Sequence, residues 1–465
     1  MYCAPAGAKE PATEPDGDHP YLSGPWAPVG EERLLFDLEV EGRLPAGLDG
    51  LYVRTGPNPY PGREGPRYHW LSGDGMVHGV RLGGGRALWY RNRWVNSPDV
   101  ARVRNLPPPA RVDGLVPEGT GNATVLCHGQ RLYAFSEMAL PYELSDSLET
   151  LGMSDFGGPM PAGSIAHPQV DPVTGELHTL AYHPDPPYLR HHVVDAAGCV
   201  RASRALPVDR PILVHDFGLT PEHLVLFDLP VLFDEEAMFE GQPLPYRWDG
   251  QGRAAVGLVP RSGDPSDAEW FEIEPCWIPH LAAVRTRSGR VTIEAIQRPA
   301  LFRDDLRGDD EGPPTLLRCV LDRRRGRVRT EVVDPDEQDL PCHDTRTPPG
   351  RGDHYWTLGI DTREGRHPPA GDRLYVHRTE RDERGEYRLP DGWRLSGPTF
   401  VPAHARSPRG SGWILGLVHE TRTDGAEGAS RLLVLDSLRP ELGPLASVRI
   451  PGRIPFGFHG CWMAD

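Results

Sequence analysis

Glycine and proline interrupt this chain so often that long helices are disfavoured: 53 glycines and 51 prolines stand among 465 residues. Glycine costs conformational entropy inside a helix, and proline removes a backbone hydrogen-bond donor. Between these residues lie short apolar runs rich in β-branched and aromatic side chains, which predict β-strands. The clearest runs are residues 131–135, 224–227, 291–295, 374–376, 413–418 and 432–435. Only residues 234–240 favour a short helix.

A chain of this length built from short strands folds as a sandwich array, a barrel or a propeller. No clean repeat of about 40–50 residues is visible, so a WD-type repeat array is not expected. No long linker divides the sequence internally. We therefore expect an all-β protein with one domain over residues 29–465, preceded by a loose arm over residues 1–28.

Charge and composition exclude several classes of function. The net charge is −16, and phosphate binding requires a basic surface, so nucleic acid is not expected as the main partner. No apolar run reaches the roughly 20 residues that span a bilayer. The first 28 residues lack the basic and apolar regions of a secretory signal, so we expect a cytoplasmic protein. The seven cysteines form no C-x-x-C pair, which disfavours a disulfide framework or a structural zinc site.

Four histidines share a local pattern, since each ends an apolar stretch and is followed by a turn or a polar residue. They are His167, His215, His280 and His459. If the chain forms seven blades of about 66 residues, the first three come from successive blades and the fourth from the blade that closes the ring. Radial symmetry would then direct four imidazoles at one axial point. For any one of them alone, a hydrogen-bonded core histidine is the more common role.

Four neutral imidazoles without a carboxylate suit a borderline transition metal such as iron, copper, nickel or zinc. An octahedral ion held in this way keeps two positions open for small molecules. Ligating imidazoles also need hydrogen-bond acceptors that fix the tautomer and the ring orientation. Glu137, which follows a predicted strand, and Asp339 are the candidates for this role. The alternative for each is a solvated acid on the surface.

A further pair of histidines lies in the segment from His69 to His78. Gly73 and Gly75 flank Asp74 there, which predicts a tight turn with positive φ. A structural turn is therefore favoured over a second metal site.

Taken together, these segments resemble the carotenoid cleavage oxygenase family from about Gly50 to the C-terminus. The matching segments are residues 50–59, 69–78, 166–172, 214–217, 276–281 and 453–460. The resemblance implies a seven-bladed β-propeller with a cap of loops and short helices over an axial metal site and a long apolar tunnel. It also implies Fe(II) bound by His167, His215, His280 and His459, with carboxylates behind the imidazoles, of which Glu137 is one.

The sequence departs from the family pattern at three positions. The family's Glu-Phe-Pro segment reads Asp339-Leu-Pro341 here, so the acid is one methylene shorter and its hydrogen bond is expected to lengthen or break. Gly397 stands where the family has another glutamate, and Ala283 stands where the family has an asparagine. Loss of such a partner typically weakens metal binding or activity 10–100-fold, so we expect iron to be held less firmly.

The reaction that the resemblance implies is oxidative cleavage of a C=C bond in a small apolar polyene by O₂, with one oxygen atom entering each of two carbonyl products. A stilbene-cleaving branch has a lysine just before the first acid, whereas Ser136 precedes Glu137 here. A carotenoid or apocarotenoid is therefore favoured over a hydroxystilbene. The remaining alternatives are polyene isomerisation and a degenerate propeller that binds an apolar ligand without turnover.

An apolar substrate of this kind partitions into membranes, which predicts a weak peripheral membrane contact through an apolar rim. The candidate rim is Leu229-Pro-Val-Leu-Phe233.

Overall fold

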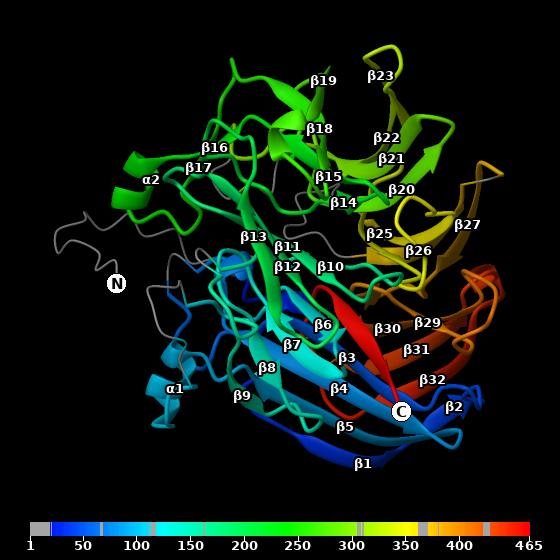
Figure 1. Ribbon diagram of the computed structural model, residues 1–465. Helices are drawn as coiled ribbons and strands as arrows, with labels where there is room; N and C mark the ends of the chain where they lie inside the picture. Colours follow the sequence, from blue (N-terminus) through cyan, green and yellow to red (C-terminus); the bar gives the residue numbers. More distant parts are fainter. Residues whose placement is uncertain are drawn as a thin grey trace.

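The computed structural model describes residue 19 and residues 21–65, 68–110, 112, 118–160, 163–304, 308, 311–360, 371–379, 381–421 and 428–465. Nearly all of its elements are short antiparallel strands, and Figure 1 shows them arranged in a ring of small sheets. The described part of the chain contains no helix that is long and apolar enough to cross a membrane.

Five of the blades are separate sheets. Blade 1 contains β1 (Leu34–Leu38), β5 (Arg86–Trp94), β4 (Gly75–Gly83), β3 (Gly50–Pro57) and β33 (Gly460–Ala464). Blade 2 contains β6 (Thr124–His128), β7 (Arg131–Phe135), β8 (Tyr142–Leu144) and β9 (Thr150–Met153), and blade 3 contains β10 (Gln169–Val170), β11 (Leu177–Tyr182), β12 (Leu189–Val194) and β13 (Val200–Ala205). Blade 4 contains β14 (Gly218–Leu219), β15 (His223–Asp228), β18 (Ala254–Pro260) and β19 (Glu269–Ile273), and blade 5 contains β20 (Leu281–Arg287), β21 (Arg290–Gln297), β22 (Thr315–Asp322) and β23 (Arg327–Asp334).

The last two blades form one ten-stranded sheet in which β28 (Trp393–Leu395) pairs with a strand of each blade. Blade 6 contains β24 (Gln338–His343), β25 (His354–Ile360), β26 (Gly371–Arg378) and β27 (Glu383–Arg388). Blade 7 contains β29 (Thr399–Pro402), β30 (Gly412–Glu420), β31 (Ser430–Asp436), β32 (Pro444–Ile450) and β2 (Val40–Gly42). Across the described residues the fold is therefore the expected all-β, seven-bladed propeller.

Both ends of the chain contribute to the closure of the ring. Near the N-terminus, β2 pairs with β32 of blade 7. At the C-terminus, β33 pairs with β3 of blade 1. Because each end supplies a strand to a blade made mostly by the other end, the closing blades are held by backbone ladders as well as by side-chain packing.

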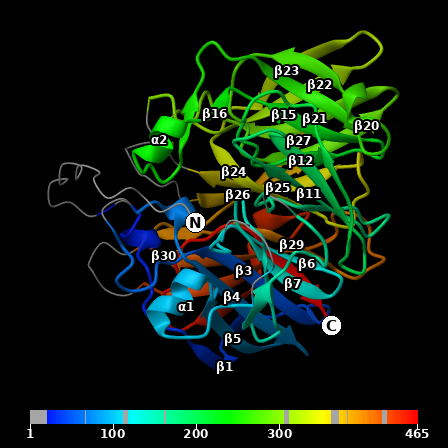
Figure 2. The same ribbon diagram turned by 60° about the vertical axis from the view of Figure 1, so that its left-hand side comes forward.

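The predicted strands are confirmed: the runs at 131–135, 224–227, 291–295, 374–376, 413–418 and 432–435 lie within β7, β15, β21, β26, β30 and β31. The predicted short helix is α2 (Glu235–Phe239), where the Asp234 side chain caps the helix by accepting the Ala237 N–H. Another helix, α1 (Pro98–Arg104), was not expected, although Ser97 as N-cap and Pro98 at the first position indicate it. In both views the two helices lie on the same side of the ring (Figures 1 and 2). Helix α2 lies near the two-stranded sheet of β16 (Val231–Phe233) and β17 (Tyr246–Trp248).

The turn predicted around Asp74 is present, but its glycines are required for a different reason. Gly73 has a φ of −68°, and Gly75 is likewise outside the positive-φ glycines of the described chain. A Cβ on Gly73 would lie 2.4 Å from the Tyr68 hydroxyl, and one on Gly75 would lie 2.4 Å from the Thr120 carbonyl oxygen. Close approach of neighbouring groups, rather than positive φ, therefore requires glycine at both positions.

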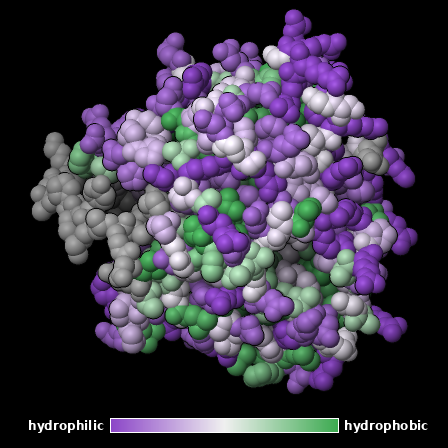
Figure 3. Space-filling model, in the orientation of Figure 1, coloured by the Kyte–Doolittle hydropathy of each residue, from purple (hydrophilic) through white to green (hydrophobic). Residues whose placement is uncertain are grey.

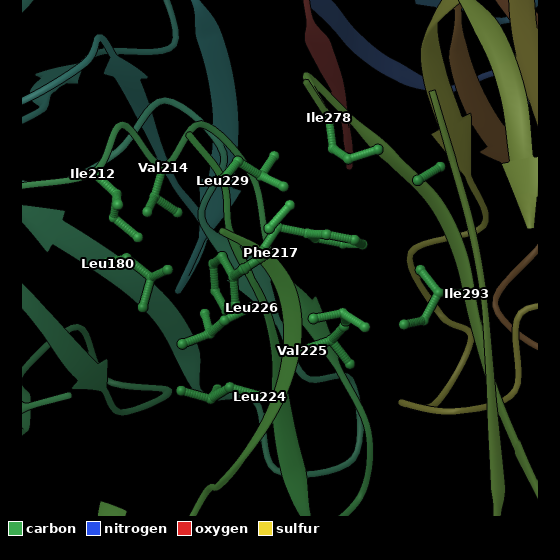
Figure 4. Close-up of a cluster of buried hydrophobic side chains, with 14 of the residues drawn as sticks. Leu180, Ile212, Val214, Phe217, Leu224, Val225, Leu226, Leu229, Ile278 and Ile293 are labelled. Carbon is green, nitrogen blue, oxygen red and sulfur yellow. The ribbon is translucent and has the colours of Figure 1, made fainter. Parts of the chain in front are cut away.

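Hydrophobic side chains fill the spaces between neighbouring blades. The largest cluster joins blades 3, 4 and 5, and Figure 4 shows Phe217 at its centre among Val214, Leu229 and Ile278. Val214 and Phe217 lie in the loop that carries His215, and Ile278 lies in the loop that carries His280. The apolar packing therefore supports the ends of the blades from which those loops emerge.

The rim predicted at residues 229–233 is wrong, because Leu229 is 1% exposed and Val231 is 0% exposed. Both belong to the cluster between blades 3 and 5, so hydrophobic burial inside the domain accounts for their apolar character. The face shown in Figure 3 is mainly hydrophilic, and its hydrophobic residues occur in small groups. Phe36 and Phe239 are the most exposed phenylalanines among the described residues, at 65% and 60%.

The arm predicted for residues 1–28 is partly packed. Tyr21 and Trp26 are 2% and 6% exposed, and the Trp26 ring lies against Trp70 and Phe456. The packed part of the chain therefore includes Tyr21 and Trp26, and most of the predicted arm lies outside the described residues.

Candidate metal centre

Four histidines meet just before strands that each lie at one edge of a blade. His280 immediately precedes β20 of blade 5. His167 stands two residues before β10 of blade 3, and His215 stands three residues before β14 of blade 4. His459 immediately precedes β33 of blade 1. The first three therefore come from successive blades, and the fourth comes from the blade that closes the ring, as the spacing predicted.

The imidazole rings are in mutual contact. The ring centroid of His167 lies 4.5 Å from that of His215, 4.9 Å from that of His280 and 4.6 Å from that of His459. The His280 ring lies 5.2 Å from His215 and 5.1 Å from His459. All the rings meet at steep angles of 60° or more, so they surround a common point rather than stack.

The nitrogen atoms that face this point are suited to a metal ion. One ring nitrogen from each of His167, His215 and His280 lies within 4.8 Å of the others. Nε2 of His280 is buried and has no hydrogen-bond partner, which is unfavourable unless another group takes the lone pair. An imidazole set with an unpaired nitrogen of this kind fits a borderline transition metal.

Two of these rings are held by carboxylates on the side that faces away from the common point. Oε1 of Glu137, from the loop after β7 in blade 2, lies 2.6 Å from Nδ1 of His215. Oδ1 of Asp339, in β24 of blade 6, lies 2.5 Å from Nδ1 of His280. In each pair the carboxylate accepts the Nδ1–H, which leaves the lone pair of Nε2 directed at the centre.

The expectation that the shorter acid at 339 lengthens or breaks its hydrogen bond is therefore wrong. β24 contains a register shift between Asp339 and Cys342, and Leu340 adopts a φ of 49°. The Leu340 N–H also bonds to Oδ1 of Asp339. This local distortion of the strand brings the shorter side chain within bonding distance of His280.

The pKa of His215, which has a carboxylate partner, shifts in the opposite direction from the pKa values of His167 and His459, which have none among the described residues. Burial alone would lower the pKa of His215, but Glu137 raises it above its usual value. Burial and the neighbouring imidazoles hold the pKa values of His167 and His459 well below the usual range. Burial alone would raise the pKa of Asp339, but the adjacent His280 lowers it. Rings with low pKa values stay neutral, which is the state that binds a metal.

Gly397 closes off the third carboxylate position by steric contact. A Cβ at Gly397 would lie 2.2 Å from the carbonyl oxygen of Phe458, next to His459. A side chain at this position therefore requires the backbone beside His459 to move. In the part of the chain that the structure describes, no carboxylate bonds to His459 or His167. Ala283, the other departure from the family pattern, is buried in β20 beside Ile296 and Tyr355.

Two residues that hold the centre together were not recognised from the sequence. The Tyr182 hydroxyl donates a hydrogen bond to Oε2 of Glu137 at 3.0 Å, so the acid is held from both oxygens. Asp216, directly after His215, accepts a backbone N–H from the residue after His280. An acid adjacent to a candidate ligand is a signal that could have identified Asp216, whereas Tyr182 carries no local signal.

The other residues considered from the sequence lie in the packed structure. His78 bonds to the Tyr90 hydroxyl at 2.9 Å inside blade 1, and the His69 side chain accepts the Leu71 N–H as a helix cap. The aromatic candidates for the tunnel wall are all buried in the inter-blade clusters; they are Phe217, Trp277, Phe400 and Phe458. A surface hollow of about 480 Å³ lies elsewhere, on blade 1, between Phe36, Trp89 and Arg91.

The comparisons with known proteins agree with this architecture. The family model described as retinal pigment epithelial membrane protein matches residues 26–464. The carotenoid cleavage oxygenase of Mycobacterium tuberculosis is 32% identical, covering 96% of this chain and 98% of the relative. The carotenoid 9,10(9′,10′)-cleavage dioxygenase 1 of Arabidopsis thaliana is 28% identical, covering 96% of this chain and 90% of the relative.

Among solved structures, the lignostilbene dioxygenase of Pseudomonas brassicacearum superposes with a TM-score of 0.84 at 24% identity, covering 97% of this chain and all of the other. This likeness establishes a shared fold. The match over residues 26–464 and the 32% identity over nearly the whole chain show that the chain belongs to the carotenoid cleavage oxygenase family.

Proposed function

We propose that this protein is an Fe(II)-dependent dioxygenase that cleaves a C=C bond of a carotenoid or apocarotenoid with O₂ to give two carbonyl products. The observation that carries the proposal is the cluster of His167, His215, His280 and His459, in which Nε2 of His280 is buried without a partner. Two of the rings are backed by carboxylates, as metal-binding imidazoles usually are.

Each group around the centre has a definite role in this proposal. The four imidazoles would hold Fe(II), and the bound ion would supply the activation of O₂. Glu137 and Asp339 accept the Nδ1–H of His215 and His280 and so fix these rings in the tautomer that presents Nε2. Tyr182 keeps Glu137 in place by donating to its other oxygen. Because both oxygen atoms enter the products, the reaction needs no external reductant.

The choice of substrate rests on two observations. The two relatives described above, at 32% and 28% identity, are named for the cleavage of carotenoids. The residue before Glu137 is Ser136, whose buried hydroxyl accepts the Thr120 N–H at 3.2 Å, so this position offers no cation to a phenol. A carotenoid or apocarotenoid is therefore favoured over a hydroxystilbene.

The decisive experiment is anaerobic reconstitution with Fe(II), followed by O₂ and product analysis on matched panels of apocarotenals and hydroxystilbenes. We expect near-stoichiometric iron, two aldehyde or ketone products from an apocarotenal, and one atom of ¹⁸O in each product under ¹⁸O₂. Cleavage of the stilbenes alone would reassign the substrate. Full-length chain that retains no iron would instead favour a propeller that binds an apolar ligand without turnover.

A cytoplasmic location and weak, reversible contact with membranes remain predictions of this proposal. Liposome flotation at low and high salt tests the contact, because hydrophobic attachment persists at high salt whereas electrostatic attachment does not.

A further inference from the structure

Asp216 connects three of the histidine loops through one buried carboxylate. The residue is 6% exposed. Its Oδ1 accepts the Phe217 N–H at 2.7 Å, and its Oδ2 accepts the Leu281 N–H at 2.8 Å. The Gln169 side-chain amide donates to Oδ1 at 3.4 Å. Each of these partners stands within two residues of His215, His280 or His167.

We propose that Asp216 is a positioning residue that sets the spacing of the His167, His215 and His280 loops and thereby the geometry of the metal centre. This inference rests on the proposed metal site. Blades 4 and 5 are separate sheets, and within the described residues no strand ladder joins β14 to β20. The bond from Asp216 to Leu281 therefore supplies a directional link that the sheets themselves do not provide.

The role of Asp216 differs from that of Glu137 and Asp339. Those two carboxylates bond to imidazole nitrogens and fix the orientation of single rings. Asp216 bonds to backbone N–H groups and fixes the main chain from which two rings project. The ring centroids of His215 and His280 lie 5.2 Å apart, and a shift of either loop would change this separation directly.

The chemistry of this link requires two acceptor oxygens. A carboxylate offers an acceptor at both ends, whereas an asparagine side chain offers one oxygen and one NH₂ group. In Asp216→Asn, the oxygen is expected to stay on the side where both the Phe217 N–H and the Gln169 amide donate. The NH₂ group then faces the Leu281 N–H, and the bond that links the two loops is the one lost. The size of the side chain is unchanged, which makes this substitution a selective test of the link.

The test uses Co(II) as a probe of the centre in the full-length chain, with affinity measured by competition against a chelator and geometry by the visible d–d absorption bands. We expect Asp216→Asn to weaken Co(II) binding 10–100-fold, as loss of a supporting hydrogen bond typically does, and to shift the absorption bands. The matched control is Asp344→Asn, which alters an equally buried carboxylate, 2% exposed, beyond the far end of β24. The control should keep the Co(II) affinity and spectrum of the parent chain.

Parental affinity and spectrum in folded Asp216→Asn would overturn the positioning role and leave the metal centre intact. Failure of the parent chain to bind one Co(II) would overturn the metal centre itself and, with it, this inference. If Asp216→Asn does not fold, Gln169→Leu serves as the second variant, because it removes one bond to Asp216 and keeps the carboxylate. A several-fold loss of affinity with altered bands is expected there, and an unchanged spectrum would overturn the proposal.

Discussion

Among the described residues, two groups of histidines lie in close contact inside the protein, and only the candidate centre brings three ring nitrogens together as a metal ion requires. In the candidate centre, carboxylates accept the Nδ1–H of His215 and His280. In blade 3, His178 and His191 also bond to each other, with Nδ1 of the first 3.0 Å from Nε2 of the second. There, however, the outer nitrogens face guanidinium groups, since Arg261 donates to Nε2 of His178 at 2.9 Å and Arg204 approaches Nδ1 of His191 at 3.3 Å.

The difference lies in where the lone pairs are directed. Two neutral imidazoles have two ring lone pairs between them. In the blade 3 pair, one lone pair accepts from Arg261 and the other is used in the bond between the rings, so none is free for a cation. In the candidate centre Nε2 of His167 and Nε2 of His215 also lie 3.1 Å apart. The carboxylates there accept the Nδ1–H of His215 and His280, however, and Nε2 of His280 keeps its lone pair unpaired. The two clusters therefore differ in the groups behind their rings: carboxylates stand behind His215 and His280, whereas guanidinium groups stand behind His178 and His191.

The largest contrast is expected when one histidine is removed from each cluster. His280→Ala should lower metal affinity by more than about 100-fold, because it removes a ligand as well as the supported geometry around it. His178→Asn should retain the metal content of the parent chain. Metal analysis after gel filtration in a chelator checks both variants, and equal metal loss in the two would contradict the distinction between the clusters.

Removing the negative charge of Asp339 or Glu137, which bond to His280 and His215, should have the next largest effect on metal retention. Asp339→Asn keeps an oxygen that can accept the Nδ1–H of His280 but removes the negative charge, and Glu137→Gln does the same for His215. We expect each to release metal to a chelator 10–100-fold faster than the parent chain. Asp344→Asn is again the control. Release at the parental rate would show that hydrogen bonding alone, without charge, is sufficient.

The blade 3 pair should make the fold sensitive to acid. Burial and then Arg261 lower the pKa of His178 to about 4. Because this folded pKa is below the unfolded value of about 6.5, the unfolded chain binds the proton first, and stability falls as the pH drops from about 6.5 to about 4. At pH 5 the loss attributable to this group reaches about 2 kcal/mol.

His178→Gln should remove this part of the pH dependence. Urea unfolding at pH 7 and pH 5 measures the change for parent and variant, and the difference between the two pH values should be smaller in the variant. Parallel curves for the two chains would assign the acid sensitivity to other groups.

The smallest effect is expected at the position without a carboxylate. Gly397→Ala places a Cβ against the Phe458 carbonyl oxygen, so the backbone beside His459 must shift. We expect a several-fold faster release of metal, and Gly397→Glu should not improve metal retention. Gly250→Ala is the control, since a Cβ there meets no atom within 4 Å. A longer metal lifetime in Gly397→Glu would show that the backbone yields and the acid completes the centre.

The sequence was sufficient for the features that depend on local pattern. Short runs bounded by turns predicted strands such as β7 and β30. The spacing of the histidines predicted that the first three come from successive blades and the fourth from the blade that closes the ring. Asp216 and Tyr182 were missed because their partners come from other loops and strands, which no local pattern reveals. The buried Leu229 and Val231 were misplaced on the surface because an apolar run does not indicate whether it faces solvent or a neighbouring blade.

The bond between Asp339 and His280 likewise depends on a backbone conformation that the sequence pattern does not reveal. Counting methylenes predicted a weakened bond to His280, but the register shift in β24 and the positive φ of Leu340 offset the missing length. Sequence comparison therefore identified the correct residue and mistook its geometry.

The pairing of β33 with β3 determines when the centre can form during synthesis. Gly50 pairs with Ala464 and Arg54 with Gly460, so the contact joins residues that the ribosome adds far apart in time. His459 is added long after the other three histidines, and the ring cannot close around a metal ion until β33 has left the ribosome. The last histidine of the cluster is thus also a marker of a closed propeller, and a chain stopped short of it carries an open ring with an incomplete set of imidazoles.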